Sequence, residues 1–211
     1  MRSYMPLSRT QRRRERRAEP LGSSMRVATY IRTGSSTPRR CTYDYMGRRI
    51  WKKVENAAGA VTLHQRYLYY DYQQIAVLDL TRPTLNSLWL LTWDPSQPIA
   101  TRPLAIQTGG TWYTYGWDIT KNICELYTTA GGIGTAYTYT PYGTVSTTSN
   151  TAKLTQPIQW SSEMHDAELG LAYYNYRYYN LTDGRWMRRD PIGIYDTNNL
   201  YSYVRNSVLQ K

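Results

Sequence analysis

The sequence is dominated by a tyrosine-rich stretch near its C-terminus, where residues 169–180 read LGLAYYNYRYYN. Five tyrosines there surround one arginine. DGRW follows at 183–186, RDPIG at 189–193 and NLYSYV at 199–204. A turn signal therefore separates the arginine from a lone carboxylate that precedes a proline. This pattern indicates strands and tight turns arranged around one pair of opposite charges.

Tyrosine is also the outstanding feature of the whole composition. The 211 residues include 22 tyrosines and 7 tryptophans, and no phenylalanine. These rings favour strands, where one ring face packs and the hydroxyl or indole N–H finds a partner. A chain of this length can bury the core of one sizeable domain. The composition therefore favours a sheet over a helical bundle.

Short alternating segments separated by Gly and Asn turns predict antiparallel hairpins. Residues 85–93 fit either a strand or a short buried helix, and Pro95, Pro98 and Pro103 predict a loop or a sheet edge. With no amphipathic helix longer than two turns, we predict an all-β chain. The predicted strands are 50–54, 61–63, 65–70, 75–80, 111–115, 123–127 and 135–139, with turns at 43–48, 56–59, 118–122, 130–132 and 141–143.

The net charge of +11 lies almost entirely in a basic leader, residues 1–40. The leader carries 11 of the 26 basic residues and two acids, whereas the other 171 residues carry 15 basic and 13 acidic side chains. We expect the leader to be a disordered, solvated arginine run, because blocks of like charge seldom fold. The alternative, polyanion binding, would use Arg12, Arg13, Arg14, Arg16 and Arg17. We expect no nucleic-acid partner for the nearly neutral body.

Neither targeting nor cofactor signals accompany this composition. The leader has no apolar core of a secretory signal, no apolar run reaches the roughly 20 residues of a membrane helix, and the start codon could be Met1 or Met25. Cys41 and Cys124 are too few for a disulfide framework, and with His64 and His165 they form no recognisable metal motif. We therefore expect no cofactor and no metal.

A weak repeat runs through the chain and carries a family resemblance. Tyr43-Asp44 recurs as Tyr70-Asp71, and residues 115–118 recur at 139–143; such periods indicate stacked hairpin units. The run Tyr43-Asp44-Tyr45-Met46-Gly47-Arg48, with Gly59 in the next turn, resembles the Rhs or YD-repeat family. The C-terminal stretch resembles that family's repeat-associated core domain more specifically. Five motifs of that domain appear in order between Gly170 and Tyr203: Gly-Leu, aromatic-Arg-Tyr-Tyr, Gly-Arg-aromatic, Arg-Asp-Pro-x-Gly and Asn-Leu-Tyr-x-Tyr. The resemblance covers about residues 41–206.

The resemblance implies an architecture and a set of partners. Family repeats wind as an antiparallel ribbon into a shell, or part of one, around a C-terminal toxin or effector, and the core domain closes one end. It divides this chain into the leader, 1–40, a YD-repeat ribbon, 41–160, and an incomplete core motif, 161–211. It also implies further shell repeats, a cargo polypeptide and delivery from bacteria to the outside or the cell surface.

By resemblance, Asp190 matches the first catalytic aspartate of an autoproteolytic, aspartic-protease-like site, and Arg177 matches an arginine that this cleavage needs. A guanidinium beside Asp190 would hold its carboxylate. If residues 171–180 form one strand, Arg177 shares a face with Tyr173 and Tyr179. The pair could equally be an ordinary ion pair that fixes the fold.

The family's second aspartate lies in a later Asp-Pro-x-Gly-Leu motif, and this sequence ends without it. Two carboxylates must share a proton for this chemistry, so we expect no self-cleavage. Asp183, in a turn signal, and Asp196, in a loop, are poor substitutes.

A different class of function is also compatible with the aromatic residues. A secreted carbohydrate-binding module would stack sugars on Trp112, Tyr113, Tyr115 and Trp117. Aromatic residues at strand spacing more often pack in a core.

Overall fold

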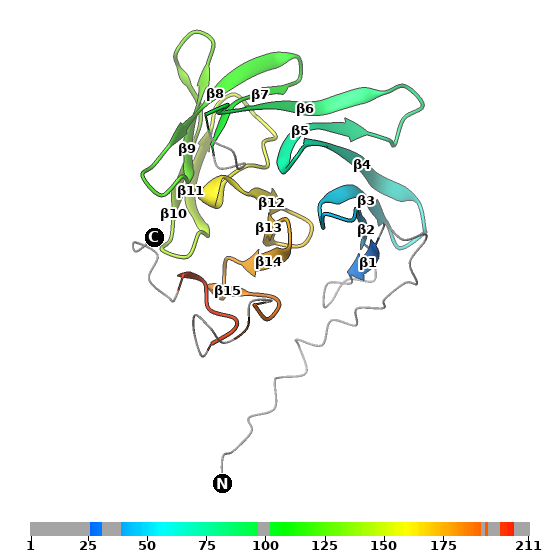
Figure 1. Cartoon of the computed structure of the whole chain (residues 1–211). Helices are drawn as coiled ribbons and strands as arrows, with labels where there is room; N and C mark the ends of the chain where they lie inside the picture. The colour runs from blue at the N-terminus through cyan, green and yellow to red at the C-terminus, as the bar shows by residue number, and fades with distance from the viewer. Residues whose placement is uncertain (1–25, 31–38, 97–101, 191–192, 194–198, 205–211) are drawn as a thin grey trace. The chain divides into compact units, whose positions relative to one another are not determined.

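The computed structural model describes residues 26–30, 39–96, 102–190, 193 and 199–204. Among these, eleven strands are hydrogen-bonded neighbours in chain order, β1 to β11, and four more, β12 to β15, form a second sheet (Figure 1). The chain divides into two compact units, residues 1–67 with 78–86 and residues 68–77 with 87–211. No helix in the described ranges is long and apolar enough to cross a membrane.

The first unit is a run of antiparallel strands around a small core. Cys41 and Tyr67 are buried in it, and the guanidinium of Arg49 lies 4.6 Å from the centre of the Tyr67 ring. Each strand pairs with the next along the chain. The strands are β1 (Arg26–Tyr30), β2 (Arg39–Tyr43), β3 (Arg49–Glu55) and β4 (Val61–Tyr70).

The second unit contains most of the other strands of the large sheet. Its buried residues include Leu91, Ile106, Ile123 and Leu126. Leu91, Ile106 and Leu126 each lie between less buried neighbours, as expected for strands with one face packed. The strands are β5 (Gln73–Asp79, whose last residues belong to the first unit), β6 (Asn86–Trp93), β7 (Pro103–Thr108), β8 (Thr111–Trp117), β9 (Ile123–Thr128), β10 (Ile133–Tyr139) and β11 (Val145–Asn150).

One turn geometry joins five pairs of strands. In each, the backbone N–H of the first residue donates to the carbonyl of the fifth, and the side-chain oxygen of the first accepts from the N–H of the fifth. The fourth residue has a positive φ of 70–95°, and four of the five are glycine because that region costs other residues about 1 kcal/mol. This is a type I turn with a G1 bulge. The turns are 44–48, 56–60, 118–122, 128–132 and 140–144.

The turn at Asp44 gives the Tyr-Asp-x-x-Gly-Arg run of residues 43–48 a structural role. Asp44 Oδ1 accepts from the N–H groups of Met46 and Arg48, at 3.0 and 2.9 Å. Asp44 Oδ2 lies 2.7 Å from both Nε and Nη2 of Arg48. One carboxylate thus closes the turn and fixes the side chain of Arg48, the residue just before β3.

The second sheet lies within the second unit and is antiparallel throughout (yellow to orange in Figure 1). A 3₁₀ turn, η2 (Trp160–Ser162), precedes it, and Ser161 and Ser162 both have positive φ. The strands are β12 (Met164–Asp166), β13 (Leu171–Tyr174), β14 (Arg177–Asn180) and β15 (Arg185–Trp186).

Two turns of the large sheet dock on η2 and the second sheet. From the 118–122 turn, Asn122 Oδ1 accepts from the Ser161 N–H at 2.8 Å, and the Lys121 carbonyl accepts from Ser162 Oγ at 2.7 Å. From the 140–144 turn, Thr144 Oγ1 donates to the Leu181 carbonyl at 3.1 Å. These turns bind the two sheets of the second unit to each other.

The prediction of an all-β antiparallel ribbon is confirmed, and several local predictions are corrected. Residues 26–30 and 39–40, inside the predicted leader, lie in strands, whereas 1–25 and 31–38 lie outside the described residues. Residues 85–93 are strand rather than helix, and 61–70 is one strand rather than two.

Two further expectations from the sequence are also wrong. Pro103 begins an internal strand instead of a loop or sheet edge, since β7 pairs with both β6 and β8. A proline is accepted at the first position of a strand. Tyr70-Asp71 does not repeat the 44–48 turn, because Asp71 itself takes a positive φ of 51° in a tighter connection between β4 and β5.

Gly143 should be the most demanding glycine of the five turns. A Cβ there would lie 2.5 Å from Trp160 and 2.7 Å from Leu181, whereas a Cβ at Gly131 would meet nothing within 4 Å. Both have positive φ, so both substitutions by alanine carry the backbone cost. We expect Gly143→Ala to lower the free energy of unfolding by about 3 kcal/mol and Gly131→Ala by about 1 kcal/mol. Denaturant titration checks this, and equal losses would contradict the docking contact.

Candidate functional site: an arginine–aspartate pair on an aromatic layer

The arginine-bearing stretch is a tight hairpin and not the single strand considered from the sequence. β13 ends at Tyr174, Asn175 takes a positive φ of 40°, and β14 begins at Arg177. Directly opposed residues of an antiparallel pair project to the same face. Tyr174 opposes Arg177 and Tyr173 opposes Tyr178. Tyr174 and Tyr179 therefore share the face of Arg177, and the predicted place of Tyr173 on that face is wrong.

Arg177 and Asp190 form an ion pair in the structure. Arg177 Nη1 donates to Asp190 Oδ2 at 2.8 Å, and the two side chains are 20% and 27% exposed. The Asp190 backbone is fixed as well, because its N–H donates to the Leu200 carbonyl at 2.9 Å. Thirteen positions separate the pair, so the ion pair and the Leu200 contact together tie three segments of the C-terminal region at one point.

The guanidinium of Arg177 also stacks on Trp186. Its central carbon lies 4.0 Å from the ring centroid, a geometry that stabilises a cation by about 1 kcal/mol at a partly exposed site. Trp186 is held by edge contacts to Tyr174 and Tyr203, with centroids 5.0 and 5.5 Å away. The ion pair therefore rests on an aromatic layer.

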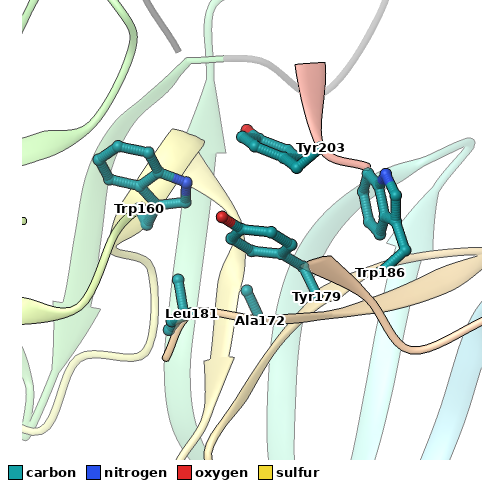
Figure 2. Packing of buried hydrophobic residues seen from close by; sticks show 6 residues of the cluster. All are labelled: Trp160, Ala172, Tyr179, Leu181, Trp186 and Tyr203. Atoms are coloured by element: carbon teal, nitrogen blue, oxygen red, sulfur yellow. The ribbon is translucent and has the colours of Figure 1, made fainter. Parts of the chain in front are cut away.

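That layer is the hydrophobic core of the second sheet. Figure 2 shows Tyr179 at the centre, with Trp160 and Trp186 on opposite sides and Tyr203 facing its ring. The Tyr179 and Tyr203 centroids are 4.3 Å apart. The remaining members of the cluster are Ala172 and Leu181.

Hydroxyl groups in and beside this core close hydrogen bonds that phenylalanine could not make. Tyr179 donates to the Tyr142 carbonyl at 3.1 Å, and the hydroxyls of Tyr174 and Tyr203 are 3.0 Å apart. Burial raises the pKa of Tyr174 well above 10.0, and the neighbouring Tyr203 adds to the shift. Burial likewise raises the pKa of Tyr179. These phenols are therefore buried in their neutral form.

The other sequence candidates do not join this site. Asp183 lies in a turn, as predicted, and its Oδ2 accepts from Asn180 Nδ2 at 2.6 Å. Asp196 and Pro191 lie outside the described residues. Within the described ranges, no group of three or more His, Cys, Asp or Glu side chains could hold a metal ion. The Cys41 side chain is fully buried.

The aromatic platform proposed for sugars is wrong. Tyr115 is only 5% exposed, and its hydroxyl donates to Gln156 at 3.2 Å. Trp112, three positions earlier in β8, lies on the opposite face of the sheet. Trp117 donates its indole N–H to the Pro103 carbonyl. The rings are divided between the two faces and partly buried, so they form no common stacking surface.

Sequence reasoning missed the residues that support the pair. Trp186 was noticed only as the aromatic position of the Gly-Arg-aromatic motif, and nothing in its spacing revealed that it lies under Arg177. Gly143 and Tyr142 were recognised as a turn, but their contact with Trp160, Leu181 and Tyr179 joins segments about 20–40 positions apart.

The comparisons with known proteins agree with this architecture. The Teneurin YD-shell family matches residues 33–207. The chain therefore belongs to the Teneurin YD-shell family, a class built from YD-type hairpin repeats.

Several relatives are described as bacterial toxins or as an Rhs protein. Toxin subunit YenC2 of Yersinia entomophaga is 39% identical over 75 residues, which are 34% of this chain and 8% of that protein. Probable deoxyribonuclease RhsB of Dickeya dadantii is 29% identical over 177 residues, 78% of this chain and 11% of the relative. The double-stranded DNA deaminase toxin A of Burkholderia cenocepacia is 32% identical over 87 residues, 40% of this chain and 6% of that toxin.

The fold is shared with solved structures of a toxin complex. The structure of TcdB2-TccC3 superimposes with a TM-score of 0.66 at 23% identity, covering 85% of this chain and 9% of the solved chain. The Tc holotoxin pore of Photorhabdus luminescens gives a TM-score of 0.67 at the same identity, with 88% and 9% coverage. The chain thus spans about a tenth of the length of these proteins.

The ion pair and the stacking contact can be separated by mutation. Arg177→Ala removes both and should lower the free energy of unfolding by about 2 kcal/mol, whereas Asp190→Ala should lower it by about 1 kcal/mol. The double variant should show coupling of about 1 kcal/mol in a thermodynamic cycle. Arg66→Ala, which truncates an exposed arginine of β4, is the control and should change stability by less than about 0.5 kcal/mol. Additive effects of the first two would contradict the pair.

The buried phenols predict a loss of stability in alkali. Their pKa values are raised above the unfolded value of 10.0, so their contribution is complete below pH 10 and is lost as the pH rises beyond it. When the pH is raised and tyrosinate absorbance is monitored, Tyr174 and Tyr179 should ionise at the same pH at which the structure is lost. Tyr174→Phe should shift this transition to higher pH. An unchanged transition would show that Tyr174 ionises without linkage to unfolding.

Proposed function

We propose that this chain forms part of the wall and the closing core of a YD shell that encloses a polypeptide toxin or effector. The observation that carries the proposal is the docking of two wall turns on the aromatic core of the second sheet. Such a contact fixes a closing element to a ribbon of hairpins. Family membership and the toxin names of the relatives support the same interpretation.

The parts of the chain have separate roles in this proposal. The ribbon, residues 41–160, supplies wall, and residues 161–211 supply the closing element, preceded by the basic segment 1–40. Further YD repeats would supply the rest of the wall, since this chain spans about a tenth of its relatives. The cargo would be a polypeptide joined on the C-terminal side.

Asp190 and Arg177 form half of a candidate autoproteolytic site in this proposal. A single carboxylate cannot share a proton with a partner, so Asp190 would act only when a second carboxylate is brought beside it. Arg177, anchored between Asp190 and Trp186, would hold the carboxylate in position. Without a second carboxylate, the Arg177–Asp190 ion pair only stabilises the core.

A chimera tests enclosure. Residues 41–206 would replace the matching segment of a complete YD-shell relative that carries its own cargo. The cargo should stay resistant to protease, and Gly143→Ala in the inserted segment should make it sensitive because the closing element no longer docks. Gly131→Ala should leave the resistance unchanged. The wall-and-core role would be refuted if the cargo were digested equally quickly in the chimeras that carry the unsubstituted, the Gly143→Ala and the Gly131→Ala segment.

The same chimera tests the half-site separately. If the relative supplies a second carboxylate, intact-mass measurement should show a cleaved cargo. Asp190→Asn should abolish cleavage while the cargo remains protease-resistant. Equal cleavage in the unsubstituted and the Asp190→Asn chimeras would show that Asp190 takes no part in the reaction. That result would not contradict enclosure of the cargo.

A further inference from the structure

Two tyrosines from hairpins far apart in sequence meet on the surface of the second unit. Tyr72 lies in the connection between β4 and β5, and Tyr176 lies in the turn between β13 and β14. Their ring centroids are 5.9 Å apart, the ring planes are inclined by 51°, and the two hydroxyls are in contact. The residues are separated by 104 positions.

Exposure distinguishes this pair from two closer tyrosine pairs of the described region. Tyr176 is 63% exposed, and its contact with Tyr72 lies at the surface. The pairs Tyr179–Tyr203 and Tyr173–Tyr178 are closer, with centroids 4.3 and 5.2 Å apart, but all four side chains are buried. A large oxidising enzyme can reach the surface pair and not the buried ones.

The buried phenols are also poor candidates for oxidation on chemical grounds. A tyrosine gives up its phenolic proton when it loses an electron. Burial raises the pKa of Tyr174 and Tyr179 and so disfavours loss of that proton. Exposure and proton loss both favour reaction at the surface pair.

We propose that Tyr72 and Tyr176 are a site of oxidative cross-linking that forms dityrosine within one chain. The oxidant is hydrogen peroxide, used by a peroxidase. Each phenol loses one electron and one proton, and the two phenoxyl radicals couple through the ring carbons next to their hydroxyls. The hydrogen on each of those carbons then moves to its phenolic oxygen, which restores both aromatic rings. One peroxide and two tyrosines give one dityrosine and two waters.

The bond would tie the β4–β5 hairpin of the large sheet to the β13–β14 hairpin that carries Arg177. It would act as a covalent staple between wall and core, beyond the docking contacts at Gly143. A cross-link that closes a loop of about 100 residues restricts the unfolded chain strongly, as a disulfide does. We expect the midpoint of thermal unfolding to rise by about 10 °C.

The test treats the folded chain, at low protein concentration, with a peroxidase and equimolar hydrogen peroxide. Dityrosine fluorescence should appear in monomeric protein. Peptide mapping should find the Tyr72 and Tyr176 peptides joined, with a mass two hydrogens below their sum. Tyr72→Phe and Tyr176→Phe should each abolish the joined peptide, whereas Tyr70→Phe, which removes the hydroxyl of an exposed neighbouring tyrosine, should leave it in place.

Several results would overturn the proposal. These are dityrosine confined to cross-linked dimers, a joined peptide that lacks either residue, or full fluorescence in Tyr72→Phe. Circular dichroism shows whether each variant is folded, and the peptide map of the unsubstituted chain decides the question even if a variant is not. A cross-linked monomer that unfolds at the same temperature as the untreated chain would refute the staple.

Discussion

The structure depends on a five-residue turn in which one side-chain oxygen closes the backbone. At Asp44, Asn56, Asp118, Thr128 and Thr140 this oxygen accepts the N–H of the fifth residue, and the fourth residue takes a positive φ. Each turn reverses the chain with a bulge beside it, so successive strands pair with their neighbours. The same turns provide the attachment points of the second sheet. Lys121 and Asn122 bind η2, and Gly143 is small enough for Trp160 and Leu181 to reach the backbone. One local geometry therefore builds the ribbon and holds the core.

Tyrosine performs a second task that phenylalanine could not. The core of the second sheet is aromatic, but its rings end in hydroxyls that reach the turn and strand carbonyls around them. Tyr179 donates to Tyr142, and Tyr139 donates to Ile123 at 2.6 Å. Backbone carbonyls buried beside the core thus keep partners, which avoids the cost of leaving them unsatisfied. The absence of phenylalanine from 211 residues is consistent with this use. The buried tyrosine hydroxyls also account for the predicted loss of stability in alkali.

The ion pair gains its position from this aromatic layer. Trp186 lies beneath Arg177, and Arg177 holds Asp190, whose backbone is held in turn by Leu200. In the proposed shell this arrangement presents one fixed carboxylate at the closing core. Tyr176 lies in the turn just before Arg177, and Tyr72 lies in the β4–β5 connection. A covalent link between them would therefore secure the hairpin that carries Arg177 to the wall. Fold, candidate site and proposed staple thus converge on residues 172–190.

Much of this was determined by the sequence alone. Alternating strands and the turn at residues 43–48 follow from local spacing, and the family resemblance of residues 170–203 implied that Arg177 and Asp190 belong to one site. Contacts between residues far apart in the sequence could not be predicted in this way. Spacing could not show that residues 171–180 bend into a hairpin, which moved Tyr174 to the face of Arg177 and Tyr173 away from it. It could not show that Tyr115 is core rather than platform, or that Gly143 meets Trp160. Local turns are fixed by backbone sterics and nearby hydrogen bonds, which a short sequence encodes. Which rings pack together depends on how distant strands are brought into register, and only the tertiary structure decided that.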